Sequence, residues 1–312
     1  MDSQLRNETK NGILLVIIAA VMWAFSGTVG QVLSQNMHFD PLWIVTVRIN
    51  IAGIIFMIIS LIKNGKALFR IFYNKKHLLQ IILFSILGNA IMQFSYFAAI
   101  SASNAATATI LQYLSPVVII ISGIVISKKK PSKIEMICTI LAVTGTFFIG
   151  THGSLESLAL SPQALIWGLI GAVSLAFYSV YPVKLMKIYG ASVVLTWAMI
   201  FGGLFLSIYS NPIGKYSNIS MDAIFQFALL IIFGTVIAFL LYSIGVGYIG
   251  GGRANMLATI EPVSSAIISY FLFHTSFMIY DYIGFICILA ITLLLGLDGV
   301  PVKNKNDTVN SR

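Results

Sequence analysis

Charged residues are scarce in this chain, and their scarcity excludes a whole class of proteins. Only 9% of the 312 residues are aspartate, glutamate, lysine or arginine, whereas 58% are hydrophobic. In an ordinary soluble domain about a quarter of the residues are charged. A surface that faces water on all sides therefore cannot be built from this sequence, and the composition predicts an integral membrane protein.

Residues that carry covalent or metal chemistry are equally sparse. The two cysteines, Cys138 and Cys287, lie within apolar runs and form neither a disulfide framework nor a Cys-x-x-Cys metal site. The four histidines have no His-x-x-x-His or Cys/His ligand spacing. Neither a His-Glu-x-x-His motif nor a Gly-x-Ser-x-Gly motif occurs. A phosphate-binding loop is also absent, because the most similar stretch, NPIGKY at 211–216, lacks the first glycine and the final hydroxyl residue of that loop. The sequence predicts no cofactor, no metal site, no ATP-driven pump and no enzyme.

Long uncharged runs are what the chain has instead. A hydrocarbon core of about 30 Å requires about 20 helical residues. Charges and turn residues divide the chain into runs near that length, which predict an all-α polytopic membrane protein with ten transmembrane helices. The predicted spans are 11–34, 41–62, 78–100, 104–126, 134–150, 163–187, 190–210, 223–249, 252–274 and 280–297. The first run follows Arg6 and Lys10, and its length indicates an uncleaved span rather than a secretory signal.

Lysine and arginine are distributed unevenly between the predicted loops. With the N-terminus in the cytoplasm, the inner segments collect 17 of the 19 basic residues, the outer segments hold only Lys215, and Arg48 lies inside a span. Basic residues concentrate in cytoplasmic loops, so both termini of this multi-pass cell-membrane protein are predicted to be cytoplasmic. The net charge of +9 then reflects loops beside a lipid bilayer and does not indicate a nucleic-acid partner. No oligomeric state is predicted.

The two halves of the chain resemble each other. AVMWAF at 20–25 matches AVSLAF at 172–177, an offset of 152 residues, and ILGNAIMQFSYF at 86–97 aligns with IFGTVIAFLLYS at 232–243, an offset of 146. The second offset continues without a gap to pair Pro116 with Pro262. Because each half contains an odd number of predicted spans, the halves enter the membrane in opposite orientations. The sequence thus predicts two inverted five-helix repeats, at 11–150 and 163–297, with a substrate site near the midplane where they meet.

Three segments together form a pattern typical of a known family. They are AAVMWAFSGTVGQVL at 19–33 and the paired proline-bearing helices ATILQYLSPVVIIISG at 108–123 and ANMLATIEPVSSAIIS at 254–269. With Arg48 in the second span, this pattern resembles the EamA branch of the drug/metabolite transporter superfamily over about residues 11–297. The resemblance implies a secondary transporter of small organic metabolites that acts by alternating access in the direction of export.

A glutamate interrupts the apolar sequence of the predicted ninth span. Glu261 and Pro262 lie in a stretch with no other charge between Arg253 and Asp281. An ionised carboxylate costs several kcal/mol to remove from water unless it is paired or neutralised. The helix could begin at Pro262, with Glu261 as a cytoplasmic N-cap, or it could begin earlier and carry Glu261 into the membrane.

The repeat favours the embedded position of Glu261. Only eleven residues separate Pro116 from Lys128, too few to cross a membrane, so span four is predicted to begin near Asn104. By the same offset, span nine is predicted to begin near Gly250 to Gly252. Glu261 then lies about 14 Å along the helix axis.

Polar residues follow one face of several spans. A proline inside a helix frees the carbonyl four residues back, which predicts free carbonyls at Gln112 and Ala258 and makes Pro116 and Pro262 hinge positions. The predicted polar faces are Ala108, Gln112 and Ser115 in span four, Ala254, Ala258 and Glu261 in span nine, and Ser85, Asn89, Gln93 and Tyr96 in span three. Such stripes either join helices by hydrogen bonds or line a watery cavity. Their coincidence with an embedded glutamate favours a cavity.

Aromatic residues and one arginine complete the set of candidates. Trp23 in span one and Tyr178 at the equivalent place in span six could stack on a substrate or simply pack, and Tyr242 is the repeat counterpart of Tyr96. Arg48 lies about 10 Å inside the outer end of span two, from where an arginine can extend to phosphate headgroups. We favour that structural role for Arg48 over binding of a substrate carboxylate.

These observations favour a transporter of a small-molecule solute. The predicted substrate-binding residues are Glu261, Gln93, Tyr96, Asn89, Gln112, Ser115, Trp23, Tyr178 and Tyr242. Neutral polar stripes with a single acidic residue suit amino acids or organic cations as substrates. Glu261 would bind the amino group of such a substrate, or a proton. The alternatives are an uptake permease of the same fold, a membrane enzyme, which would need converging catalytic groups, and a non-transporting sensor without a solvated cavity.

Overall fold

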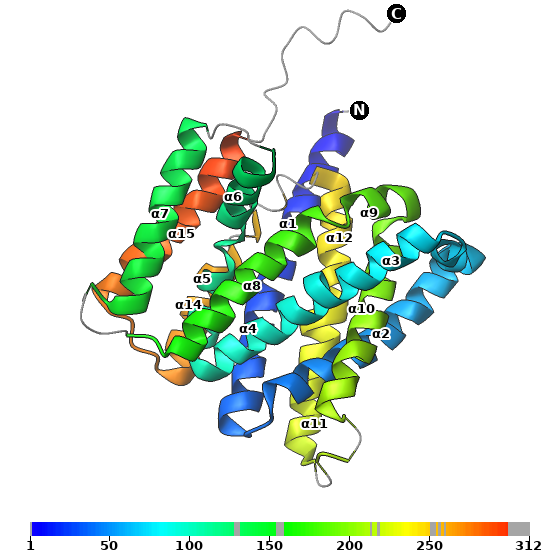
Figure 1. The fold of residues 1–312 in the computed structure, drawn as a ribbon, viewed down its shortest axis with the longest axis horizontal. Helices are drawn as coiled ribbons and strands as arrows, with labels where there is room; N and C mark the ends of the chain where they lie inside the picture. Colours follow the sequence, from blue (N-terminus) through cyan, green and yellow to red (C-terminus); the bar gives the residue numbers. More distant parts are fainter. Residues whose placement is uncertain are drawn as a thin grey trace, which may run out of the picture.

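The structure, a computed structural model, describes residues 2–127, 132–153, 159–212, 214–216, 219–249, 254, 257–258 and 260–298 (Figure 1). Within these ranges all regular secondary structure is helical. The first half contains α1 (Asp2–Gln31), η1 (Val32–Asn36), α2 (Pro41–Asn64), η2 (Gly65–Tyr73), α3 (Lys75–Leu83), η3 (Phe84–Ala90), α4 (Ile91–Ala102), α5 (Ala105–Gln112), α6 (Ser115–Ser127) and α7 (Lys133–Thr151). The second half contains α8 (Pro162–Val180), α9 (Val183–Tyr189), α10 (Ala191–Ser210), α11 (Met221–Ala228), η4 (Leu229–Ile237), α12 (Ala238–Ile249), α14 (Ile260–Phe273) and α15 (Ile279–Asp298). The prediction of an all-α membrane protein is confirmed.

Eight helices of the described chain are long and apolar enough to cross a membrane. They cover Thr9–Asn36, Pro41–Tyr73, Lys75–Ala102, Ala105–Gly123, Lys133–Thr151, Pro162–Tyr189, Ala191–Ser210 and Met221–Ile249, and two shorter apolar helices cover Ile260–Phe273 and Ile279–Ile291. The eight long helices correspond to the first eight predicted spans. The predicted start of the ninth span near Gly252 lies outside the described residues.

Short polar residues fix where several of these helices begin. Asp40 accepts a hydrogen bond from the Leu42 N–H at 2.8 Å, directly before Pro41 at the first helical position of α2. Ser161 caps α8 in the same way ahead of Pro162. A side-chain oxygen at the N-cap satisfies an otherwise unpaired N–H, and proline at the first position needs none. The sequence therefore sets these helix starts locally.

The helices pack mainly in pairs that join the two halves of the chain. The principal pairs are α1 with α12, α2 with α10, α4 with α8, α5 with α14, and α7 with α15. In Figure 1, α7 and α15 stand together at the left, while α2, α3 and α10 lie at the right. Each half therefore depends on the other for its packed core.

Two of these pairs approach closely at glycines. A Cβ atom placed on Gly245 of α12 would lie 2.6 Å from Val16 Cγ2 and 3.0 Å from the Gly12 carbonyl oxygen of α1. A Cβ atom on Gly145 of α7 would lie 3.1 Å from the Gly284 carbonyl oxygen of α15. Small residues let membrane helices approach closely enough for van der Waals contact, which in lipid replaces the hydrophobic effect as the attraction between helices. These glycines therefore set the spacing of α1–α12 and α7–α15.

Two long helices contain a π-helical segment near their middle. η3 covers Phe84–Ala90 and η4 covers Leu229–Ile237, so they lie at matching places under the 146-residue offset. η3 packs on α8 and α10, and η4 packs on α1 and α2. A π-helical turn contains an additional residue and leaves a backbone carbonyl without its usual partner. Within η4, Thr235 Oγ1 donates a hydrogen bond to the Leu230 carbonyl oxygen at 3.0 Å.

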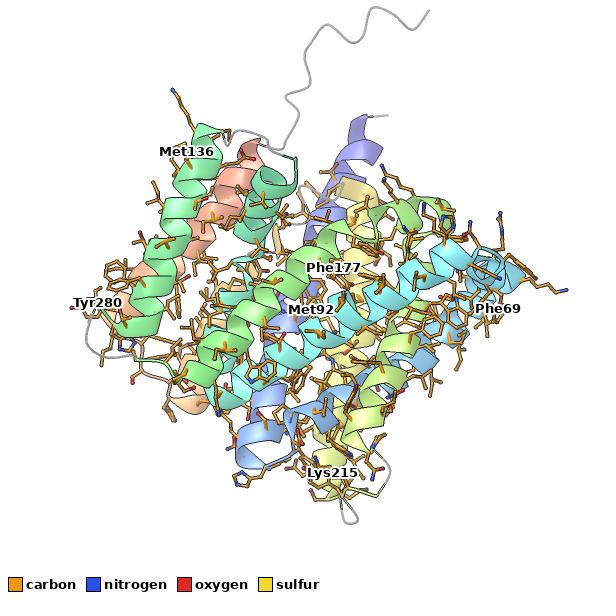
Figure 2. All side chains as sticks on the ribbon, viewed as in Figure 1. Phe69, Met92, Met136, Phe177, Lys215 and Tyr280 are labelled. Atoms are coloured by element: carbon orange, nitrogen blue, oxygen red, sulfur yellow. The ribbon has the colours of Figure 1, made fainter. Side chains whose placement is uncertain are left out.

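The start of the described chain and its end lie on the same side of the bundle. α1 begins and α15 ends at the top of Figure 1. Lys215, in the connection between α10 and α11, lies at the opposite end in Figure 2. Its ammonium group pairs with Asp40, which ties this connection to the start of α2.

Candidate substrate-binding cavity

A cavity of about 600 Å³ lies between the two halves of the chain. Residues from α1, α2, α4, α5, α6, α8, α9, α10, α12 and α14 contribute to its wall, so elements from both halves enclose it. This volume is within the range of pockets that hold small organic molecules. The wall is mainly apolar and carries a small number of polar groups, which is typical of such pockets.

Most of the predicted site residues face this cavity. The members of the predicted set that line it are Glu261, Gln93, Tyr96, Gln112, Ser115, Trp23, Tyr178 and Tyr242, together with Pro116 and Arg48. Asn89 and Pro262 do not line it. Residues from eight helices, which belong to both halves of the chain, are thus brought to one chamber.

Asn89 and Ser85 point away from the cavity, into the contact with α10. Asn89 donates a hydrogen bond to the Ala198 carbonyl at 3.3 Å, and Ser85 donates to the Ile81 carbonyl at 2.6 Å. Both residues lie in η3, whose wider turn changes the direction of side chains four residues apart. The predicted stripe of span three therefore divides: Gln93 reaches the cavity, and Asn89 joins two helices.

Glu261 lies near the start of α14 and is linked to the break between α5 and α6. Its Oε2 lies 3.1 Å from the Tyr113 hydroxyl oxygen, which is also 2.7 Å from the Ala258 carbonyl oxygen. The Ala258 carbonyl is the one that Pro262 prevents from accepting a helical hydrogen bond. Tyr113 thus connects the paired proline-bearing segments. It lines the cavity too, and the predicted set omitted it, although it directly follows Gln112.

Arg48 lies inside the bundle, and the prediction that it reaches the headgroups is wrong. Its side chain is only 4% exposed. Its Nε donates a hydrogen bond to Thr235 Oγ1 at 2.7 Å and its Nη2 donates to the Gly234 carbonyl at 3.4 Å, while the guanidinium carbon lies 5.1 Å from the centre of the Phe97 ring. The position of Arg48 along α2 indicated its depth but not its direction, and α2 turns this residue toward η4 and the cavity.

A cluster of aromatic side chains forms one wall of the cavity. The Trp23 ring centre lies 5.2 Å from that of Phe239 and 5.0 Å from that of Tyr242. Trp23 Nε1 and Ser26 Oγ, although buried, have no hydrogen-bond partner among the described residues. Buried polar atoms are normally paired, so these two groups are exceptions among the described residues.

The cavity extends toward the side of the bundle where α1 begins. Pro182, Met186 and Ala191 line it at the α8–α10 connection, and Val246 lines it near the end of α12, beside the start of α1. On the other side, two glutamines of span one, spaced by one helical turn, hold the α4–α5 connection. These glutamines were absent from the predicted set.

The two glutamines bind backbone groups at the α4–α5 connection. Gln35 Nε2 donates hydrogen bonds to the Ile100 and Ser103 carbonyls, both at 2.9 Å. Gln31 Oε1 accepts a hydrogen bond from the Ala105 N–H at 2.9 Å. The end of α4 and the start of α5 are therefore fixed to the end of α1, which closes this side of the bundle.

Cysteine accessibility can test which side chains of span three face the cavity. In a background in which Cys138 and Cys287 are replaced by alanine, Gln93→Cys is expected to react with a small water-soluble thiol reagent, because Gln93 lines the cavity. Asn89→Cys is the matched control and is expected to stay unmodified, because position 89 packs against α10. Mass spectrometry of the intact protein measures both. Equal reaction at the two positions would contradict the observed division of the stripe.

The described residues contain no cluster of three or more histidine, cysteine, aspartate or glutamate side chains that could hold a metal ion. His152 Nε2 lies 3.1 Å from Asp281 Oδ1, a pair that joins the end of α7 to the start of α15 away from the cavity. The position of this pair indicates a structural role, in which it holds α7 and α15 together.

Comparison with known proteins gives a consistent result. The model of the EamA-like transporter family matches residues 10–151 and 162–297. The uncharacterized inner membrane transporter YicL of Salmonella typhimurium is 36% identical over 290 residues, which cover 93% of this chain and 96% of that protein. The uncharacterized transporter YyaM of Bacillus subtilis is 23% identical over 277 residues, 86% of this chain and 89% of that protein. A solved crystal structure, 16% identical in sequence, has the same fold with a TM-score of 0.62 over 94% of this chain and 98% of its own.

Proposed function

Because the chain belongs to the EamA-like transporter family, we propose that it exports a small organic solute across the cell membrane by alternating access around this cavity. The observation that carries the proposal is the chamber between the two halves, in which a carboxylate and a guanidinium face an otherwise mainly apolar wall. The size and composition of the wall suit a metabolite with both an apolar part and a charged part. We propose amino acids or organic cations as the solute class, with Glu261 as the group that binds the amino nitrogen.

Two inverted five-helix repeats are part of the proposal. The family model matches two stretches of similar length, 10–151 and 162–297. The helix pairing supports the same division: exchange of the halves turns the α1–α12 pair into the α8–α4 pair and leaves α2–α10, α5–α14 and α7–α15 as they are. The π-helical segments η3 and η4 also occupy matching places. In inverted repeats the substrate site lies between the halves, which agrees with the location of the cavity.

We propose that the cavity faces the cytoplasm in this conformation. The excess of basic residues on the N-terminal side supports cytoplasmic termini, and the cavity extends to that side. The glutamine contacts to the α4–α5 connection would then form part of the outer closure. Rearrangement of these contacts would accompany opening to the outside.

The geometry around Glu261 supports a role for a proton. A hydroxyl group carries a single hydrogen, whereas the Tyr113 hydroxyl lies within hydrogen-bond distance of both the Ala258 carbonyl and Glu261 Oε2. When Glu261 carries a proton, it donates to Tyr113, and Tyr113 donates to Ala258. When Glu261 is ionised, the carboxylate and the carbonyl compete for one hydrogen. We propose that this conformation holds Glu261 protonated and that exchange of the proton for a substrate amino group couples transport to pH.

Comparison of metabolites inside and outside cells tests the proposal. Cells that overproduce the protein are expected to release one class of amino-containing metabolite into the medium, whereas cells that lack it are expected to retain that class. Reconstitution in proteoliposomes then measures the flux of the identified compound directly. Depletion of the compound from the medium of overproducing cells would indicate uptake, and unchanged profiles in both strains would contradict transport of a metabolite.

A further inference from the structure

Arg48 is a buried cation that has no carboxylate in direct contact among the described residues. No carboxylate oxygen of the described residues lies within 4.0 Å of its guanidinium, since the ion pairs found there join His152 to Asp281 and Lys215 to Asp40. Removal of an unpaired charge from water is costly, and buried charges are normally paired or hydrogen-bonded. Glu261, the other ionisable group of the cavity wall, is hydrogen-bonded to Tyr113. Within the described part of the chain, therefore, no carboxylate forms a direct ion pair with Arg48.

The contacts of Arg48 orient its guanidinium and leave part of it available. A guanidinium carries five N–H donors in a planar fork. The described contacts use the Nε donor, on Thr235 Oγ1, and one Nη2 donor, on the Gly234 carbonyl. The Phe97 ring covers the guanidinium at 5.1 Å. Both contacts to η4 hold one edge of the fork, while the residue lines the cavity. The three remaining donors can thus serve a ligand in the cavity.

From this geometry we infer that Arg48 binds a carboxylate group of the transported solute. The planar fork matches a carboxylate by two parallel hydrogen bonds, and the anionic ligand supplies a counter-charge in direct contact with the guanidinium. The inference rests on the proposed function and deepens it, because a solute that also places an amino group at Glu261 is a zwitterion. Arg48 would then select zwitterionic solutes over simple organic cations, because such cations have no carboxylate to bind the guanidinium.

The wall between the two charges defines the remainder of the ligand. Trp23, Met92 and Phe239 contribute apolar surface to the same chamber. A multiply charged anion would meet Glu261 and this apolar wall. The arrangement therefore fits a compact ligand with one carboxylate, one ammonium group and an apolar side chain.

Matched ligand sets separate the two charges experimentally. The full-length protein in lipid nanodiscs is titrated with leucine, with 3-methylbutylamine, which lacks the carboxylate, and with 4-methylpentanoate, which lacks the amino group. A second set uses phenylalanine, 2-phenylethylamine and 3-phenylpropanoate. The midpoint of thermal unfolding as a function of ligand concentration gives the apparent affinity. Arg48→Gln is expected to weaken binding of the amino acid and of the carboxylate about tenfold or more, because charge-assisted hydrogen bonds are lost, and to leave amine binding unchanged.

Control variants distinguish this inference from the proposed function. Arg70→Gln removes a positive charge from an exposed position in η2, and this variant is expected to bind all probes as the unmodified protein does. Glu261→Gln is expected to weaken amine binding and to spare the carboxylate, so its failure would count against the proposed role of Glu261 and not against Arg48. If Arg48→Gln does not fold, Arg48→Lys keeps the charge and is expected to weaken carboxylate binding through loss of the fork.

Three outcomes would overturn the inference. The first is that no carboxylate-bearing probe stabilises the unmodified protein. The second is that Arg48→Gln or Arg48→Lys binds carboxylates and amines with the same ratio as the unmodified protein. The third is that chloride or inorganic phosphate stabilises the protein through Arg48 as well as the carboxylates do, which would assign the site to a simple inorganic anion.

Discussion

Replacement of Glu261 by glutamine is expected to abolish coupled transport. The amide keeps the size of the side chain and can still accept a hydrogen bond from Tyr113, but it can neither be ionised nor carry an exchangeable proton. Loss of a charge-assisted contact to a substrate ammonium group weakens binding by about ten- to a hundredfold. Flux of the solute into proteoliposomes, measured at two pH values, is expected to fall accordingly and to lose its dependence on pH.

Two further variants frame that result. Asp222→Asn removes a carboxylate from the exposed first turn of α11 and is expected to transport as the unmodified protein does. Tyr113→Phe removes the hydroxyl between Glu261 and the Ala258 carbonyl and is expected to retain substrate binding but to shift the pH profile. Transport by Glu261→Gln that is undiminished and still pH-dependent would remove Glu261 from the mechanism.

The replacement of Gly245 by leucine is expected to disrupt the folded protein. A side chain at this position would meet Val16 and the Gly12 backbone of α1 at contact distances that cannot accommodate it. Overpacking a tight contact costs about 1–3 kcal/mol and more when backbone must move. Because α1 also lines the cavity through Trp23 and Ser26, displacement of α1 from α12 is expected to impair substrate binding as well.

Gly247 provides the matched control on the same helix. Space is open within 4 Å of a Cβ placed there, so Gly247→Leu is expected to fold normally and to gain helix propensity. The midpoint of thermal unfolding in detergent is expected to fall by about 5 °C or more for the Gly245 variant and to stay near that of the unmodified protein for the Gly247 variant. Equal midpoints for both variants would show that the α1–α12 contact contributes little to stability.

Local signals allowed much of the fold to be predicted from the sequence. Uncharged runs predicted the position of the first eight spans. In the structure, Asp40 and Ser161, each followed by a proline, cap the helices at two of these starts. The paired prolines predicted the unusual backbone around Ala258, and its carbonyl does accept a bond from outside its own helix. These features depend on residues close together in the chain, which is why a single sequence contains them.

The candidate site was only partly predictable, because it depends on which side of each helix faces the cavity. A regular helical period placed Asn89 with Gln93, whereas the π-helical η3 sends Asn89 to α10. Counting residues gave the depth of Arg48 but not its contact with Thr235, 187 positions later in the chain. Tyr113 gained its significance only when α5 and α14 were brought together. The spacing of residues within one helix cannot predict these long-range contacts between helices.

The interruption between α5 and α6 has a consequence for biogenesis. The two segments have 8 and 13 residues, and neither is long enough to cross a bilayer by itself, since a spanning helix requires about 20. Between them, Tyr113 and Leu114 form a turn whose polar backbone is tolerated at membrane depth only when other helices shield it. This span is therefore expected to complete its insertion only after α8 and α14, which pack on it, have been synthesised. During synthesis, the fourth span would remain shielded from lipid and incompletely inserted. The bundle would be completed only after the second half of the chain has been inserted.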